Sequence, residues 1–220
     1  MNNVESPITD LATLTSMVPA QQSIEAFNEL VNSGGFFPRL QLMTSNTELA
    51  KEGKVRVNSY AIIDGKNYTE LGPETVVVPL HWRPFALSTK ENPIVSSHDQ
   101  KSELFKKIEK LSSVKNSGAM CGPEFLVWVP DAEKFATLFF GSVSARRVGK
   151  TFVLQMNKPT LLKSEMVQTT DFKWYIIKHE DYTPGIDKFP SASELQSTIE
   201  KFINPPVATV EVANEPATDR

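Results

Sequence analysis

The nonapeptide SARRVGKTF, residues 144–152, ends in the Gly-Lys-Thr triplet that closes a phosphate-binding P-loop. That motif also requires a glycine at position 144, where this chain has Ser144. A P-loop leads into a helix, whereas the TFVLQM segment at 151–156 is typical of a strand. We therefore expect Gly149 and Lys150 to form a hairpin turn with a solvated lysine, and we expect no nucleotide hydrolysis.

Other residues capable of catalysis or metal binding are dispersed. His81, His98 and His179 have no cysteine or histidine at the spacing of a metal site. Cys121, in MCGPEF, is expected in a loop entering a strand. A buried, inert thiol is the favoured interpretation, because a nucleophilic one needs a histidine nearby. No nucleophile-elbow pattern is present. The sequence therefore predicts a protein that is not an enzyme and needs no cofactor or metal.

Basic residues interleaved with aromatic residues are the remaining chemical signal. Cations that follow the phosphates and rings that stack on bases bind single-stranded nucleic acid, at about 1–3 kcal/mol per stacked base. The candidate phosphate contacts are Arg39, Lys54, Arg56, Arg83, Arg146, Arg147 and Lys150, and the candidate stacking residues are Trp82, Phe85 and Tyr60. Each also has an ordinary interpretation, since aromatic residues in strands usually lie in the core and arginines near turns are usually solvated.

The charge pattern favours a local binding surface. The whole chain has a net charge of −3, which gives no general attraction to nucleic acid. The segment from Lys134 to Ser164, in contrast, has six basic residues and no acidic residue. We expect Arg146 and Arg147 to flank a strand bend at the rim of a groove inside this segment.

The helices that surround these residues follow from hydrophobic periodicity. One is predicted in AQQSIEAFNELVNSGG and a second in DQKSELFKKIEKLSSVK, whose apolar face is Leu104, Phe105, Ile108 and Leu111. A third is predicted in SASELQSTIEKFI, with Ser191 or Ser193 as its N-cap.

The strands follow from alternation and turn residues. Asp64-Gly65 predicts a hairpin in KVRVNSYAIIDGKNYTEL, and Pro79 and Pro84 predict an edge or a bend in ETVVVPLHWRPFALS. Further strands are predicted in FFPRLQLM, EFLVWVP, EKFATLFFGSVSA, TFVLQM, TLLKSEMVQ and FKWYIIKHE. This pattern predicts a mainly β, α+β protein with an OB-like β-barrel or sandwich core and two or three peripheral helices.

Size and composition predict the overall organisation. A chain of 220 residues with 40% apolar residues can bury a core. We expect an N-terminal arm and helix over 1–33, a β-rich core over 34–180, a C-terminal helix over 181–203 and a disordered tail over 204–220. One cysteine, no secretory signal and no apolar run of about 20 residues predict a cytoplasmic protein without membrane contact.

Four segments carry a resemblance to a known family. They are FPRLQLMTSNTELAKEGKV, ELGPETVVVPLHWRPFAL, GPEFLVWVPDAEKFATLFFGSVSARR and FKWYIIKHE, within roughly residues 35–180. They resemble small proteins encoded by tailed bacteriophages, some of which look like single-stranded DNA-binding proteins with an OB-type core. The resemblance implies a location in the host cytoplasm and a role in phage DNA replication or recombination, with replication proteins or further copies of the chain as partners. The tail EVANEPATDR is only weakly acidic, unlike the recruiting tails of such proteins.

The sequence thus favours sequence-nonspecific binding of single-stranded DNA. The alternative is a non-enzymatic phage protein, either a structural component of the virion or packaged cargo. An enzyme with an unrecognised site is the second alternative.

Overall fold

The computed structural model describes residues 37–90, 94–168, 170 and 173–204. The helix predicted in residues 20–33 lies outside the described residues, as does the predicted tail except for Asn204.

Nine strands of the described residues form one mixed sheet in the order β3-β2-β1-β7-β6-β4-β8-β9, with β5 paired to β4. Within the described strands, β1 and β7 are the one pair that runs in parallel. The strands are β1 (Arg39–Leu42), β2 (Tyr60–Asp64), β3 (Asn67–Gly72), β4 (Glu74–Ser88), β5 (Val95–Ser97), β6 (Ala119–Val129), β7 (Lys134–Phe139), β8 (Thr160–Gln168) and β9 (Lys173–Asp181). The α-helices of the described part of the chain are α3 (Glu48–Lys51), α4 (Glu103–Leu111), α5 (Val143–Phe152) and α6 (Ala192–Ile203). The predicted mainly β, α+β class is confirmed.

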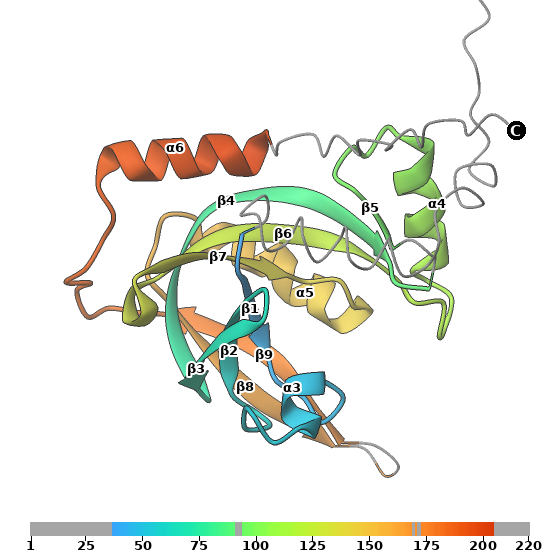
Figure 1. Ribbon diagram of the computed structural model, residues 1–220, viewed down its shortest axis with the longest axis horizontal. Coiled ribbons are helices and arrows are strands. Elements are labelled where there is room, and N and C mark those ends of the chain that lie inside the picture. The colour runs from blue at the N-terminus through green and yellow to red at the C-terminus, as the bar shows by residue number, and fades with distance from the viewer. Residues whose placement is uncertain (1–36, 91–93, 169, 171–172, 205–220) are drawn as a thin grey trace, which may run out of the picture.

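The long strand β4 connects two parts of the sheet. Residues 74–77 pair with β8, and residues 78–88 pair with β6 after a register shift between Pro79 and His81. Among the described strands, residues 78–85 pair with β6 alone. Pro79 and Pro84 lack a backbone N–H, but no described strand on the other side of β4 needs that hydrogen bond. Figure 1 shows β4 arching over the molecule, and both the bend and the open edge agree with the prediction.

Alternation along β6 divides the core between two layers. Phe125 and Val127 face a cluster that includes Phe152 of α5 and Leu162 of β8. Leu126 and Trp128 face the opposite cluster, where Phe202, Leu195 and Ile199 of α6 pack. The central strands are therefore covered by α6 on one face and by α5 with the β8–β9 hairpin on the other (Figure 1).

The sheet curls but does not close into a barrel. Its terminal strands, β3 and β9, do not pair with each other in the described residues. Side chains bridge the opening instead: the Tyr60 hydroxyl donates a hydrogen bond to the Lys163 carbonyl at 3.0 Å, and the Ser164 hydroxyl bonds to Asn58. The curl brings β2 close to β8 and encloses the larger core cluster.

Three locally encoded elements agree with the sequence. The β2–β3 hairpin turns at Gly65, which has a φ of 59°, between the paired residues Asp64 and Asn67. Helix α4 begins where the Ser102 hydroxyl accepts a hydrogen bond from the Phe105 amide at 3.1 Å. Helix α6 is capped in the same way by Ser191. No helix in the described part of the chain is long and apolar enough to cross a membrane.

Residues 143–152 form helix α5, so the predicted strand bend and hairpin turn are wrong. The Ser142 hydroxyl accepts a hydrogen bond from the Ala145 amide at 3.1 Å, which begins the helix. Phe152, which the sequence pattern assigned to a strand, is fully buried at the helix end. Packing of this ring against Phe125 and Phe140 outweighs the strand preference of TFVLQM.

The position of Gly149 and Lys150 in α5 gives a better reason to reject a P-loop. A P-loop binds phosphate with the free amides at the start of a helix. Both residues lie in the last turn of α5, where unsatisfied carbonyls rather than amides are found. Cys121 also differs from its prediction, since it lies within β6 rather than in a loop.

Candidate nucleic-acid interface

Helix α5 presents cations on two flanks. Residues four apart share one flank of a helix, so Arg146 lies beside Lys150, and Arg147 lies beside Thr151. None of the salt bridges among the described residues involves Arg146, Arg147 or Lys150. These three cations are therefore available to an anionic ligand.

The first flank borders a hollow of about 260 Å³, which we call the Trp82 hollow. Trp82 of β4 lines it together with Arg146 and Lys150, and 43% of Trp82 is exposed. Gly149 forms part of the wall, where an added Cβ would lie 2.7 Å from Pro123 Cγ. The missing side chain lets α5 approach β6 closely enough to form this wall.

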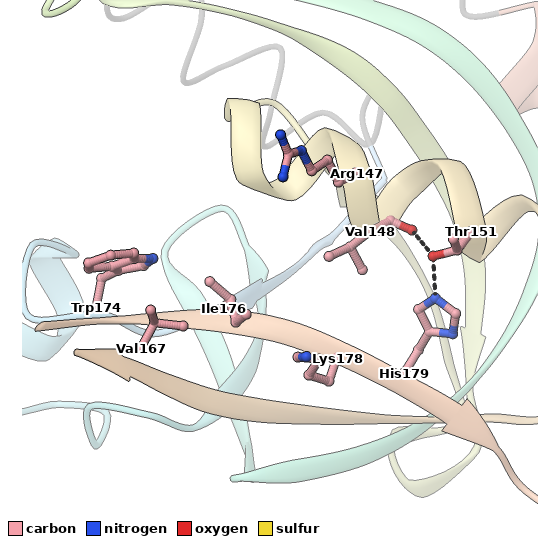
Figure 2. Close-up of a pocket in the computed structure, with 8 residues that line it drawn as sticks. All are labelled: Arg147, Val148, Thr151, Val167, Trp174, Ile176, Lys178 and His179. Atoms are coloured by element: carbon pink, nitrogen blue, oxygen red, sulfur yellow. Dashed lines mark hydrogen bonds between the residues drawn. The ribbon is translucent and has the colours of Figure 1, made fainter. Parts of the chain in front are cut away.

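The second flank borders a larger groove of about 780 Å³, which we call the Trp174 groove (Figure 2). Helix α5 supplies Arg147, Val148 and Thr151, β8 supplies Val167, and β9 supplies Trp174, Ile176, Lys178 and His179. At one end, Thr151 meets His179, and Arg147 and Trp174 lie toward the other end (Figure 2). The groove therefore combines an apolar lining with two cations and an indole that is 40% exposed.

Hydrogen bonds determine the tautomer of His179, and burial determines its charge. The Thr151 hydroxyl donates to the Val148 carbonyl at 2.9 Å, so it accepts from His179 Nε2–H at 2.9 Å. His179 Nδ1 is buried and has no hydrogen-bond partner among the described residues. Burial lowers the pKa of His179, and the charge of Asp181 opposes this effect. His179 is therefore neutral at pH 7 and contributes a hydrogen bond rather than a charge.

The carboxylates near the two sites differ in position. The Trp82 hollow includes Glu109 of α4 in its lining. Among the described residues, the lining of the Trp174 groove contains no carboxylate, but Glu165 lies 3.0 Å from the Lys178 ammonium. Both members of that pair are about half exposed, so solvent screens their attraction strongly.

Four of the ten residues predicted to bind nucleic acid line the two sites, and three of them share one site. Trp82, Arg146 and Lys150 line the Trp82 hollow, although Trp82 is distant from α5 in the sequence. Arg147 lines the Trp174 groove on the opposite flank of the helix.

Four other candidates lie outside these two sites. Arg39 is exposed on β1. Lys54 pairs with Glu52 and Arg56 with Glu70, both at 2.7 Å, and the Lys54 pKa is raised by its hydrogen bond to Glu52. The Phe85 ring is partly buried, stacked on His98 at a centroid distance of 4.7 Å and in edge contact with Phe139. Its stacking face is thus already used within the protein.

The structure contradicts the roles predicted for Tyr60 and Arg83. Tyr60 is fully buried, and burial raises its pKa, so the ring cannot meet a base. Arg83, whose side chain is 14% exposed, forms an ion pair at 2.8 Å with the buried Glu124. Its guanidinium lies 4.1 Å from the centre of the Phe202 ring and bonds to the Phe202 carbonyl. Arg83 therefore fastens α6 to β4 and does not reach a phosphate.

Trp174 and Lys178 were not among the residues predicted from the sequence. The segment FKWYIIKHE interleaves aromatic and basic residues, which is the signal used for the other stretches. Trp174, Ile176 and Lys178 are two residues apart, so on a strand they share one face. That alternation would have been sufficient to identify Trp174 and Lys178 as candidates from the sequence.

No group of three or more His, Cys, Asp or Glu side chains in the described residues could hold a metal ion. The Cys121 thiol is buried against α4, and burial raises its pKa. A thiol with a raised pKa is a weak nucleophile at neutral pH.

No protein-family model, curated protein or solved structure matches the chain. The resemblance to phage proteins therefore stays a prediction.

Proposed function

We propose that this protein is a non-enzymatic, sequence-nonspecific single-stranded DNA-binding protein. The observation that carries the proposal is the Trp82 hollow, where an exposed tryptophan lies with two unpaired cations. Stacking rings beside cations that follow the phosphates are the common features of surfaces that bind single strands without sequence preference. An OB-like architecture of the curled sheet, and a role in phage DNA replication or recombination, remain parts of this proposal.

The arrangement gives each side chain a distinct role. Arg146 and Lys150 contact successive phosphates from one flank of α5, while the Trp82 ring stacks on a base. Glu109 repels phosphates from the α4 side of the hollow, so the backbone of the strand follows α5. Because every base has a π-face and phosphates carry no sequence information, this mode of binding discriminates little between sequences.

A salt series with fluorescently labelled single-stranded oligonucleotide tests the proposal. Removal of one cation that touches a phosphate should reduce the slope of log affinity against log salt by about 0.7. The double variant R146A/K150A should therefore bind more weakly with a flatter slope. W82A should bind more weakly with the wild-type slope, because stacking releases no counterions.

The matched control is K66A, which removes an exposed cation from the turn of the β2–β3 hairpin, away from both linings. Its affinity and slope should equal those of the wild type. Unchanged binding by W82A and R146A/K150A, with native melting behaviour, would contradict the proposed site. Failure of the wild type to bind any oligonucleotide would instead favour the alternative, a structural or packaged protein of the virion.

A further inference from the structure

The Trp174 groove lies on the opposite flank of the helix that borders the Trp82 hollow. Adjacent residues of a helix are rotated by about 100° from each other, so Arg146 and Arg147 point into different sites. Lys178 of β9 lines the groove together with Arg147. Trp174 is exposed beside Val167, its direct cross-strand neighbour. The groove thus repeats the chemistry of the hollow, with a ring for stacking and cations for phosphate, although none of its β8 or β9 residues is used by the proposed site.

We propose that the Trp174 groove is a second subsite for the same DNA strand, which crosses α5 between the two sites. This inference rests on the proposed function. One base stacks on Trp174 above the apolar surface of Val167 and Ile176, and Arg147 contacts a phosphate as the strand leaves the helix. Lys178 exchanges its exposed ion pair with Glu165 for a second phosphate.

The dimensions of α5 are compatible with such a crossing. A helix with its side chains is about 10–12 Å wide. At the B-form spacing of about 3.4 Å per nucleotide, about four nucleotides at most span that width, and a more extended single strand needs fewer. A 20-nucleotide oligothymidylate is therefore long enough to occupy both sites at once.

Nucleic acid fits the groove better than a small anion or a purely apolar ligand does. A small anion would use the two cations but leave the exposed indole and the apolar lining uncovered. A purely apolar ligand would leave both cations unused. A nucleotide chain presents a flat apolar ring and a phosphate in every repeat, which matches both kinds of lining.

Tryptophan fluorescence tests the second subsite separately from the first. The chain has three tryptophans, and Trp128 is buried, with its indole N–H donating to the Lys188 carbonyl at 3.0 Å. W82F therefore leaves Trp174 as the exposed reporter, and W174F leaves Trp82. Phenylalanine still offers a ring for stacking, so both variants should bind. A base stacked on an indole quenches its emission.

We expect a saturating 20-nucleotide oligothymidylate to quench the emission of both variants. Quenching of W174F without quenching of W82F would overturn the second subsite and leave the proposed function in place. Quenching of W82F without quenching of W174F would support the groove and refute the hollow. If the wild type does not bind the oligonucleotide, both proposals fail.

Affinity measurements provide an independent readout. W174A should weaken binding of the same oligonucleotide by about 5- to 150-fold, the range for loss of one stacked base. R147A should flatten the salt slope by about 0.7, in addition to the effect of R146A/K150A. The matched control is M166A, which removes an exposed apolar residue that points away from Val167 on β8. If W174A binds no more weakly than M166A, the groove is not a subsite.

Discussion

Burial decides which of the candidate aromatic and basic residues can meet a ligand. Tyr60 and Trp82 were predicted to share a role, yet the first is fully buried and 43% of the second is exposed. Arg83 and Arg56 form a similar contrast, since the Arg83 side chain is covered by α6 and the Arg56 side chain is solvated. Each contrast can be tested with one substitution.

Replacement of Tyr60 by phenylalanine removes the hydroxyl that donates to the Lys163 carbonyl and leaves the buried ring in place. We expect the free energy of unfolding to fall by about 0.5–1.5 kcal/mol, the net contribution of one hydrogen bond. Affinity for oligonucleotide should not change. Urea denaturation and a binding titration on the same sample measure both quantities. Weaker binding with unchanged stability would mean that Tyr60 faces the DNA.

Replacement of Arg83 by alanine leaves the Glu124 carboxylate buried without its main partner. Loss of one member of a buried ion pair costs about 3–5 kcal/mol, so R83A should lower the free energy of unfolding by a similar amount. The control is R56A, which breaks an exposed pair and should change stability little. Thermal melting of both variants distinguishes them. Equal melting temperatures would show that Arg83 does not fasten α6.

At the scale of the element, α5 is stabilised by its contacts with the sheet rather than by its own sequence. Phe152 packs into the core, and Gly149 lets the helix lie directly against Pro123 and Phe140. On the other side, the Thr151–His179 hydrogen bond joins α5 to β9. Changes at these contacts should move the helix, and both proposed sites with it.

G149A tests the close approach of α5 to β6. In a free helix, alanine is favoured over glycine by about 1 kcal/mol. Here the new Cβ would lie 2.7 Å from Pro123 Cγ, an atom of a rigid ring, and overpacking of this kind costs about 1–3 kcal/mol. We therefore expect G149A to lower the free energy of unfolding, measured in urea, whereas K150A at the exposed neighbouring position stays within about 0.5 kcal/mol. A stabilised G149A protein would show that α5 has room to move.

The His179 contact predicts a pH dependence. Its pKa in the folded protein lies below the unfolded value of about 6.5, because burial disfavours the cation. The unfolded chain therefore binds more protons as the pH falls through 6.5, and the folded state loses stability there. The urea midpoint of the wild type should fall between pH 7.5 and pH 5 by more than that of H179Q, which does not titrate. Parallel curves would rule out this role for His179.

At the scale of the molecule, one core cluster contains side chains from both parts of the curled sheet, the part with β1 and β6 and the part with β8. It joins Leu40 of β1, Phe125 of β6, Phe152 of α5 and Leu162 of β8. Because the side chains of β8 complete a core that begins at β1, we expect the described fold to unfold as a single cooperative unit.

L162A tests this cooperativity. Leu162 is fully buried, and its truncation should cost about 2–5 kcal/mol. Circular dichroism, which follows the whole backbone, and the fluorescence of Trp128, measured in a W82F/W174F background, should show one common midpoint shifted to lower urea. Trp128 belongs to the other core cluster, on the α6 face of the sheet. Separate midpoints would mean that the β8–β9 hairpin unfolds independently.

The sequence by itself determined the elements whose signals are local. The helical periodicity of α4, the serine cap of α6, the glycine turn of the β2–β3 hairpin and the alternation of the long strands were all recognised, whereas the Ser102 cap of α4 was not. These signals depend on contacts within a few residues, so they can be read without knowledge of the fold. The mainly β class followed from them.

The tertiary structure alone decided the state of α5 and the exposure of the candidate residues. TFVLQM has the composition of a strand. Its Phe152, however, packs between Phe125 of β6 and Phe140, which follows β7, and these long-range contacts favour the helix. The same folding buries Tyr60 and Arg83, leaves Trp82 and Trp174 exposed, and places them on opposite flanks of α5. Burial and proximity arise from pairing between strands far apart in the chain, and no local pattern in the sequence encodes that pairing.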